Sequence, residues 1–193
     1  MDSKLSLLRT ALGEVRVKEK EPIKFHVFSK IGGPAEFFYL ATSQKELILV
    51  LDTCYELKVP FFLIGSGTKV LLSEQGLSGM VIKNRSSAIK IGAIKGKVGK
   101  EGLGIEEAQL EIESGTSLGK INEYLRSQKL QEIEGISSVH SSLGGSLFLD
   151  PVIIELTEII KVWQDGEVFE IKPFELKRNV HIVISVILRV KSV

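Results

Sequence analysis

The spacing of apolar residues in the first third of the chain predicts a strand, a helix and a second strand. Residues 37–40 form an apolar run typical of a strand. Residues 43–57 then have apolar positions at helical spacing, and they begin with Ser43-Gln44-Lys45-Glu46, which is a capping box. The helical positions that we expect to face a core are Leu47, Val50, Leu51, Cys54 and Tyr55. The run from Phe61 to Ile64 then predicts a short buried strand.

The residues before this unit predict one further helix. Asp2 and Ser3 are suited to cap a helix that runs to about Leu12, and Gly13 is suited to end it. Residues 15–21 alternate in charge, and we expect them to be a solvated segment.

Asn84 marks the boundary that we expect between two lobes. Residues 88–104 are rich in glycine and predict a hairpin with a mobile tip, and residues 109–113 alternate as a strand. Lysines at positions 90, 95, 97 and 100 are either a basic patch for phosphates or nucleic acid, or part of a solvated loop. We favour the solvated loop, because no aromatic side chain is interleaved to stack on bases.

The rest of the second lobe combines a helix with strands. Residues 117–128 predict a helix that turns Leu118, Ile121 and Leu125 inward. Asp165-Gly166 is a strong signal for a tight hairpin turn. Residues 181–190 are rich in β-branched side chains and form a strand long enough to be central in a sheet.

Composition narrows the classes of function. The 193 residues carry 25 Lys and Arg against 24 Asp and Glu, so net charge gives no argument for nucleic acid or an anionic membrane. The single cysteine, Cys54, excludes an internal disulfide and fits a reducing compartment. It lies on the apolar side of a helix, and we interpret it as a small buried hydrophobe and not as a nucleophile. No apolar run has the length of a membrane helix, and we expect a cytoplasmic protein.

The turn Gly65-Ser66-Gly67-Thr68 is the first candidate for a ligand site. It follows a strand, and small residues let consecutive peptide N–H groups approach an anion such as a phosphate or pyrophosphate. The spacing fits neither the P-loop nor the dinucleotide-binding motif, and residues 80–82 continue as an extended segment where both motifs need a helix. The alternative is an ordinary Gly-Ser loop.

The second candidate is the segment from Gly135 to Ser146. A helix beginning near Ser138 or Ser141 would aim its N-terminal amides at a phosphate. His140 lies among serines here, but closeness in sequence to Asp150 is no evidence for a catalytic triad, and we expect a loop histidine near the ligand. The remaining histidines show no metal-ligand spacing, so no metal site is predicted.

Four motifs of the chain occur in an order that is typical of one family. They are Phe28-Ser29-Lys30-Ile31-Gly32-Gly33-Pro34-Ala35-Glu36-Phe37-Phe38; Leu63 to Lys69 with the trailing Gly76 and Gly79; Gly115-Thr116-Ser117-Leu118; and Gly135-Ile136 followed by Gly144-Gly145-Ser146. As a set they resemble the FAD-binding domain of MurB-type UDP-N-acetylenolpyruvoylglucosamine reductases. The resemblance extends from about Phe25 to Val190.

The resemblance implies a two-lobed α+β fold of the MurB and PCMH type. Residues 1–84 would form a small strand–helix–strand lobe with the pyrophosphate loop, and residues 85–193 a larger, mainly antiparallel sheet lobe with helices. The implied cofactor is FAD. The residues implied to bind its pyrophosphate are Gly65, Ser66, Gly67, Thr68, Lys69 and Val70, and those implied for the rest of the flavin are Gly135, Ile136, Gly144, Gly145 and Ser146.

Two of these positions carry a specific expectation. Lys69 stands where the family usually has asparagine, so its ammonium group either neutralises the pyrophosphate or projects into solvent. We also expect Gly67→Val to abolish flavin binding by filling the space of the pyrophosphate, with the fold intact.

The chain departs from the family near the flavin. The segment after Ile136 is longer by three residues, residues 149–154 replace an Asn-Ala-Gly-Ala-Tyr-Gly-like stretch, and residues 174–179 lack the family's Tyr-Arg pair, for which Arg178 is a poorly aligned substitute. The family's substrate lobe would follow the last strand, and we expect no substrate-binding domain in this chain. No catalytic residue is therefore assigned.

Three functions remain open. The first is a flavin-dependent oxidoreductase like UDP-N-acetylmuramate dehydrogenase, with FAD and either a separate substrate-binding polypeptide or a homo-oligomer as partners. The second is a non-catalytic relative that stores flavin or binds another protein. The third, nucleic-acid binding through the lysine-rich loop, ranks last, and we expect neither nucleic acid nor a membrane as a partner.

Overall fold

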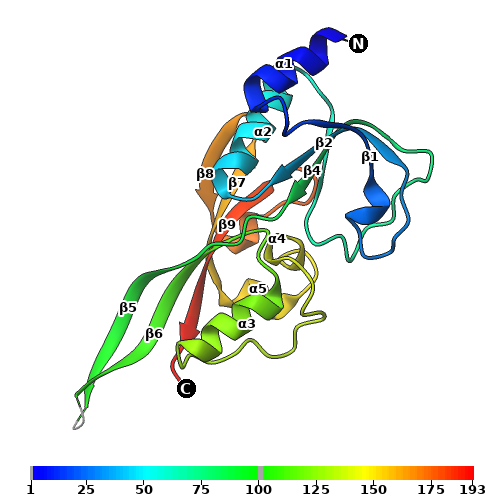
Figure 1. Ribbon diagram of the computed structural model, residues 1–193. Coiled ribbons are helices and arrows are strands. Elements are labelled where there is room, and N and C mark those ends of the chain that lie inside the picture. The colour runs from blue at the N-terminus through cyan, green and yellow to red at the C-terminus, as the bar shows by residue number, and fades with distance from the viewer. Residues whose placement is uncertain (1, 100–101) are drawn as a thin grey trace. The chain divides into compact units, whose positions relative to one another are not determined.

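The computed structural model describes residues 2–99 and 102–193, with side chains for residues 4–96 and 105–193. The chain divides into two compact units, Met1–Ser86 with Asp165–Glu167, and Ser87–Gln164 with Val168–Val193. Each unit has a sheet of its own (Figure 1). The tip of the glycine-rich hairpin, which we predicted to be mobile, lies outside the described residues.

The first unit is built on a four-stranded sheet in the order β1–β2–β4–β3. Its strands are β1 (Lys18–Pro22), β2 (Pro34–Ala41), β3 (Phe61–Ile64) and β4 (Leu77–Asn84). Strands β2 and β3 both run parallel to β4, whereas β1 is antiparallel to β2. Because parallel strands end at the same edge, the loop that leaves β3 begins beside the last residues of β4.

Helix α2 (Gln44–Glu56) connects β2 to β3 and begins as predicted, with the Ser43 hydroxyl accepting a hydrogen bond from the Glu46 amide at 3.3 Å. Its buried positions include Leu47, Val50, Leu51 and Cys54. Helix α1 (Asp2–Leu12) also forms as predicted, and η1 (Ile23–Phe25) follows β1. A further apolar cluster of this unit consists of Ile23, Val27, Ala35, Phe38, Ile64 and Val81.

One prediction for the first unit is extended by the structure, and two need correction. Residues 18–22 form the edge strand β1, where charged side chains stay in water while the backbone pairs with β2. Tyr55 is 49% exposed and does not face the core. In β3, which we predicted to be buried, Phe62 is 40% exposed and only Ile64 is fully covered, at 1%.

The second unit is built on a five-stranded sheet in the order β5–β6–β9–β7–β8. Its strands are β5 (Ile89–Gly99), β6 (Gly102–Glu113), β7 (Thr157–Gln164), β8 (Glu167–Ile171) and β9 (Ile182–Lys191). The pairs β5–β6, β6–β9 and β7–β9 are antiparallel, and β9 is central as predicted. Asp165 and Gly166 join β7 to β8 with φ of 51° and 88°, the conformation of the predicted hairpin turn.

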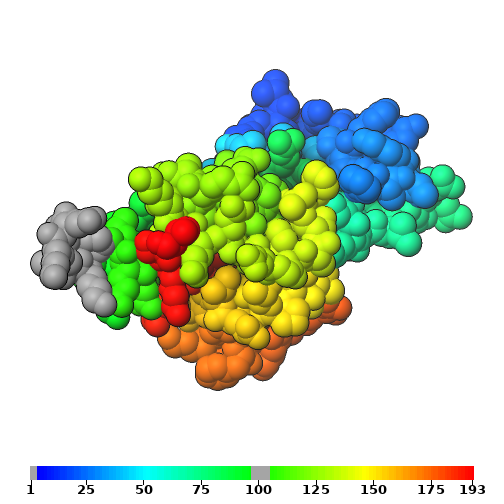
Figure 2. Space-filling view, turned by 90° about the horizontal axis from the view of Figure 1, so that it is seen from below, coloured from blue at the N-terminus to red at the C-terminus, as the bar shows by residue number. Residues whose placement is uncertain are grey.

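Helices α3 (Leu118–Ser127), α4 (Leu143–Ser146) and α5 (Pro151–Leu156) gather on one face of this sheet (Figure 1), and η2 (Pro173–Glu175) precedes β9. The inward residues of α3 are those predicted, Leu118, Ile121 and Leu125, and they share a core with residues of β6, β7 and β9. The end of β9 lies at the surface beside the segment that follows α3, where the Gln131 amide donates to the Lys191 carbonyl at 2.9 Å (Figure 2). Within the described residues no helix is long and apolar enough to cross a membrane.

Candidate functional site

The first candidate loop, Gly65 to Val70, leaves the carboxyl end of β3. The hydroxyl oxygens of Ser66 and Thr68 lie 3.1 Å apart, and both side chains are half-buried. The Phe28 amide donates to the Gly67 carbonyl at 3.0 Å, which ties the turn to the segment after η1. The loop therefore presents a pair of hydroxyl groups on a short, anchored turn, an arrangement suited to an anion.

We predicted that Gly67 leaves space for the pyrophosphate, whereas in the structure this glycine lets the chain pack closely on itself. Its φ is +77°, and a Cβ atom there would lie 2.8 Å from the Val27 Cα and 2.9 Å from the His26 carbonyl oxygen. The space beside Gly67 is thus filled by the chain's own backbone. The expectation that Gly67→Val would leave the fold intact is wrong, because the added side chain meets backbone atoms that cannot move away cheaply.

The other glycines of this region also permit close backbone contacts. A Cβ on Gly33 would lie 2.2 Å from the Glu74 carbonyl oxygen, and the Gly33 amide donates to the Ser73 carbonyl at 2.9 Å. A Cβ on Gly76 would lie 2.5 Å from the Pro34 carbonyl oxygen. The motif around Gly33 therefore packs against the turn before β4 and holds it in place.

Lys83 is a residue of this site that the sequence pattern missed. It lies near the end of β4, is only 7% exposed, and donates from Nζ to the His26 carbonyl oxygen at 2.7 Å. Burial, together with the nearby positive charge of Arg85, lowers the pKa of Lys83 to about 8. The signal available in the sequence was a lysine that continues the apolar run of residues 80–82 without a break.

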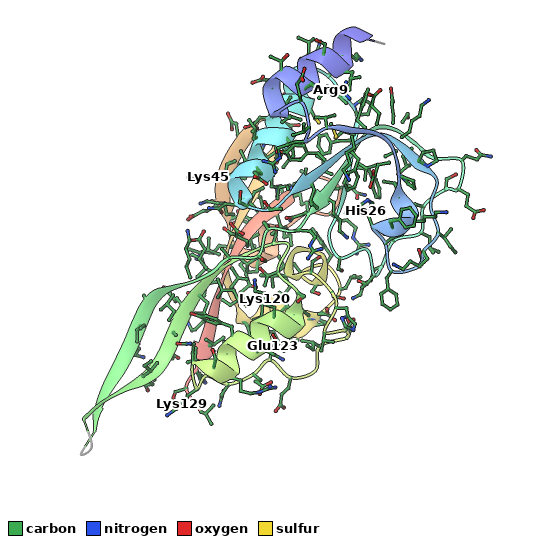
Figure 3. The ribbon with its side chains drawn as sticks, viewed as in Figure 1. Arg9, His26, Lys45, Lys120, Glu123 and Lys129 are labelled. Atoms are coloured by element: carbon green, nitrogen blue, oxygen red, sulfur yellow. The ribbon has the colours of Figure 1, made fainter. Side chains whose placement is uncertain are left out.

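His26 supplies its carbonyl to Lys83 and has its ring fixed by other neighbours. The ring stacks on Phe38 with centroids 4.2 Å apart, and its Nε2 lies 2.8 Å from the Glu21 carboxylate. In Figure 3 His26 lies beside η1 in the first unit. His26 is thus held by contacts with residues of β1, β2 and β4.

The second candidate segment, Gly135 to Ser146, is anchored to the loop before α3. The Leu118 amide donates to the Ser141 carbonyl at 2.9 Å, and the Gly144 amide donates to the Ser114 carbonyl at 2.8 Å. The helix predicted to begin near Ser138 or Ser141 begins slightly later, because α4 is a single turn from Leu143 to Ser146 with Ser142 as its N-cap. The Gly144 amide is used by the protein itself, so this residue serves packing.

The hydroxyl groups of this segment offer better ligand contacts than its amides. Ser141 and Ser146 are 3% and 0% exposed, and neither hydroxyl oxygen has a hydrogen-bond partner among the described residues. Buried polar atoms without partners are rare, and a bound polar group would satisfy them. Gly135 has a φ of +72° and no atom within 4 Å of the position of a Cβ, so its surface is open. Ile136 is half-buried against the apolar core of the second unit.

The predicted residues thus fall into two groups, one in each unit. In the first unit the structure brings together Ser66, Thr68 and the unpredicted Lys83 around the Gly67 turn, while the Lys69 side chain is exposed. In the second unit the Ser142 hydroxyl oxygen lies 3.3 Å from the position of a Cβ on Gly145, and the Ser146 amide donates to the Ser142 carbonyl at 3.0 Å. Within the first unit the buried ammonium group fits a phosphate, and within the second unit the orphaned hydroxyls fit a polar ligand group.

The other reactive side chains give no sign of a second kind of chemistry. Cys54 is fully buried, and burial raises the pKa of its thiol to about 12, which confirms that it is a buried hydrophobe. Among the described residues, no group of three or more His, Cys, Asp and Glu side chains is placed to hold a metal ion.

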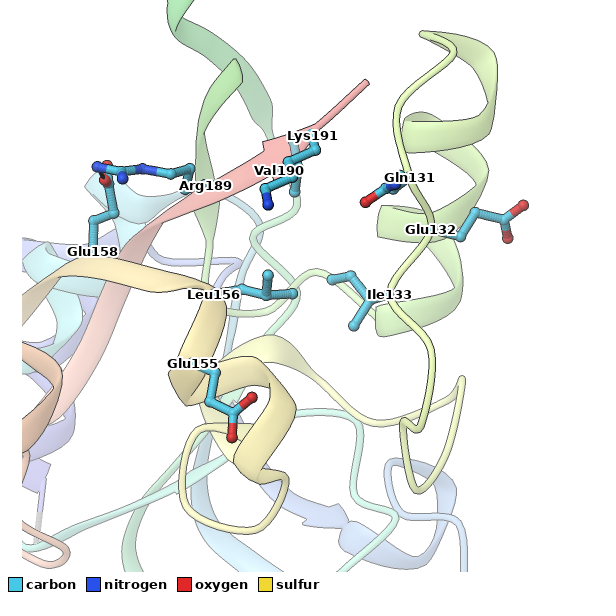
Figure 4. Close-up of a pocket in the computed structure, with 9 residues that line it drawn as sticks. All are labelled: Gln131, Glu132, Ile133, Glu155, Leu156, Glu158, Arg189, Val190 and Lys191. Atoms are coloured by element: carbon cyan, nitrogen blue, oxygen red, sulfur yellow. Dashed lines mark ion pairs between the residues drawn. The ribbon is translucent and has the colours of Figure 1, made fainter. Parts of the chain in front are cut away.

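A pocket of about 470 Å³ opens in the second unit at the end of β9 (Figure 4). Glu158 and Arg189 form an ion pair at one side of it, and Ile133 and Leu156 face each other across its apolar part. None of the predicted cofactor residues lines this pocket. Pocket size alone therefore does not identify the candidate site.

Comparison with known proteins gives relatives in sequence and structure. UDP-N-acetylenolpyruvoylglucosamine reductase of Caldanaerobacter subterraneus is 32% identical over 143 residues, which are 74% of this chain and 43% of the relative. The structure of UDP-N-acetylenolpyruvylglucosamine reductase (MurB) from Thermus caldophilus matches with a TM-score of 0.58 at 18% identity, over 92% of this chain and 60% of that one. Substrate-bound p-cresol methylhydroxylase matches with a TM-score of 0.64 at 14% identity, over 99% of this chain and 43% of that one.

These relatives confirm the predicted two-lobed α+β fold of the MurB and PCMH type and the resemblance to MurB reductases. The chain spans about half the length of the curated relatives that it matches. A family described as "FAD binding domain" matches residues 35–148, a range that includes both candidate segments and agrees with the predicted cofactor, FAD. With more than half of its length in that match, the chain belongs to the FAD binding domain family.

Proposed function

We propose that the protein binds FAD through the two candidate segments. The pyrophosphate contacts the loop Gly65-Ser66-Gly67-Thr68-Lys69-Val70. The rest of the flavin contacts Gly135, Ile136, Gly144, Gly145 and Ser146. Gly67 and Gly144 shape their segments and do not donate hydrogen bonds to the ligand. The observation that carries this proposal is the set of buried groups inside the family match. The hydroxyls of Ser141 and Ser146 have no partner among the described residues, and Lys83 has no counter-ion among them.

We further propose that the protein is a flavin-dependent oxidoreductase of the kind named by its relatives, acting on UDP-N-acetylenolpyruvoylglucosamine in peptidoglycan precursor synthesis in the cytoplasm. Bound FAD would supply the hydride for the reduction. The chain's own residues would bind the pyrophosphate, orient the flavin and keep water away from it. The matched part of this chain covers only 43% and 52% of two curated relatives, so a substrate-binding polypeptide or a second copy of the chain is part of this proposal.

The first test is the visible absorption spectrum of the purified protein after FAD has been added and the excess removed. We expect a bound flavin spectrum and a melting temperature that rises with FAD concentration, because a ligand that binds only the folded state stabilises it by mass action. A colourless protein with an unchanged melting temperature would contradict FAD binding.

The oxidoreductase proposal is tested separately on the FAD-loaded protein. The flavin is reduced chemically without oxygen, and UDP-N-acetylenolpyruvoylglucosamine is then added. Return of the oxidised flavin spectrum on addition of this compound, and not of UDP-N-acetylglucosamine, supports the activity. A flavin that stays reduced argues for the second candidate, a flavin-binding protein without turnover. One observation favours that candidate: residues 151–156, near the expected flavin contacts, form helix α5, which buries Ile153 in the core.

A further inference from the structure

Lys83 is a buried lysine in an apolar strand. Its strand partners are Leu40 on β2 and Ile64 on β3, and only 7% of the residue is exposed. Among the described residues no carboxylate lies within ion-pair distance of its Nζ. Burying an ammonium group without a counter-ion is costly, so a lysine in this position needs a compensating role.

The ammonium group of Lys83 lies at the base of the Gly65 to Val70 loop. Its hydrogen-bond acceptor, the His26 carbonyl oxygen at 2.7 Å, is also the atom that a Cβ on Gly67 would approach to 2.9 Å. One carbonyl group therefore touches both the lysine and the turn. An ammonium group has three N–H donors, and the His26 carbonyl is the one acceptor that it meets in the part of the chain that the structure describes.

The charged groups near Lys83 leave the base of the loop positive. Arg85 lies two residues after Lys83, just beyond the end of β4, and acts on Lys83 electrostatically. On the neighbouring elements, the Glu21 carboxylate is held by the His26 ring at 2.8 Å and by Lys18 at 3.5 Å. The Glu21 carboxylate is thus already paired, and none of the ion pairs among the described residues includes Lys83.

We propose that Lys83 binds a phosphate oxygen of the FAD pyrophosphate from beneath the Gly65 to Val70 loop. This inference rests on the proposed function, because it assigns a further residue to the same cofactor site. The phosphate would take the free N–H donors and supply the missing counter-ion, while the Ser66 and Thr68 hydroxyls contact the same group from the loop.

This role predicts that FAD affinity depends on pH. In the free protein burial and Arg85 lower the pKa of Lys83 to about 8, whereas a bound phosphate favours the charged lysine and raises this pKa. Above pH 8 the free protein must take up a proton to bind FAD. The dissociation constant should therefore increase with pH, by up to about tenfold per pH unit, until the pKa of the complex is reached.

The experiment measures FAD binding by titration calorimetry for the wild type, for Lys83→Met and for the control Lys45→Met. Lys45 is an exposed lysine of α2, labelled in Figure 3, and its replacement makes the same change of charge in the same unit. At pH 7 we expect Lys83→Met to weaken FAD binding about ten- to a hundredfold, as for other charge-assisted contacts, and Lys45→Met to change it less than twofold. The wild-type affinity should fall between pH 7.5 and 9.5, and that of Lys83→Met should not.

The outcomes separate this inference from the proposed function. Equal FAD affinity of the wild type and Lys83→Met, or a wild-type affinity that is constant from pH 7.5 to 9.5, would overturn the role of Lys83 while FAD binding stands. The pH series needs no variant, so it decides the matter even where Lys83→Met does not fold. A wild type that binds no FAD at all would overturn both proposals.

Discussion

Lys83 also makes a prediction about the stability of the protein without cofactor. Its pKa in the folded protein is about 8, below its ordinary value of 10.5. Between these two pH values the unfolded chain binds more protons than the folded one, so the free energy of unfolding must rise with pH. A shift of about 2.5 pH units at about 1.4 kcal/mol per unit corresponds to about 3 kcal/mol of stability that is absent below pH 8 and is gained by pH 10.5.

Replacing Lys83 by methionine removes this penalty together with one hydrogen bond. The lost bond to the His26 carbonyl costs about 1–2 kcal/mol, so Lys83→Met should be more stable than the wild type at pH 7 by about 1–2 kcal/mol. At pH 10.5 the wild-type lysine is neutral, and the variant should then be less stable by about 1 kcal/mol. A substitution that weakens cofactor binding is therefore expected to stabilise the free protein.

The assay is urea unfolding without FAD, followed by far-ultraviolet circular dichroism from pH 7 to 10.5. The difference in unfolding free energy between Lys83→Met and the wild type should change sign across this range, whereas the difference for Lys45→Met should stay near zero. Subtracting the wild-type pH profile from that of each variant removes the contribution of the titrating residues that both proteins share. Parallel pH profiles for the wild type and Lys83→Met would refute the reasoning, since the lysine would then titrate alike in the folded and unfolded chains.

Three other substitutions or conditions test separate parts of the structure. Gly67→Ala should lower the free energy of unfolding by about 2 kcal/mol or more. Gly135 has the same left-handed conformation but open space around it, so Gly135→Ala should lower this free energy by only about 1 kcal/mol. Equal losses in thermal unfolding would contradict the packing argument. Cys54 should react with a thiol reagent only after unfolding in urea, because burial raises its pKa to about 12, and rapid labelling of the native protein would be inconsistent with that burial. The Arg16 guanidinium lowers the pKa of Glu46 to about 2, so Glu46 contributes stability that is fully present above pH 4.5 and is lost as the pH falls towards 2. Glu46→Gln should therefore reduce the loss of unfolding free energy over this acid range by about 1 kcal/mol.

The elements with strong periodicity were predictable from the sequence. Helices α2 and α3 follow from apolar residues at helical spacing behind Ser43 and Ser117, and the turn at Asp165 follows from its glycine neighbour, because these signals are local. Strand β1 was not predictable, because its charged residues are compatible with a solvated loop as well as with an edge strand. Only the pairing with β2 distinguishes the two.

The candidate turn could be identified from the sequence, but the contacts that pack it could not. The Gly-Ser turn at residues 65–68 was found because small residues after a strand are a local pattern. A glycine is needed at position 67 because a Cβ atom there would collide with Val27. Val27 lies forty residues earlier in the chain, so no local pattern reveals this contact. Lys83 was missed because its importance depends on burial by β2, β3 and the His26 segment, and burial is a property of the tertiary structure.

The glycine- and lysine-rich strand β5 has a further consequence for the behaviour of the protein in concentrated solution. It is an outer strand of its sheet, and Ile91 and Ile94 on it are 42% and 53% exposed. Such a strand offers unpaired peptide groups to any other strand that meets it. Lys90 and Lys95, with the irregular register between Ile91 and Ile94, make that meeting unfavourable through charge repulsion and a bent edge. The lysines that suggested a basic binding patch can thus be understood as protection against self-association of exposed strands.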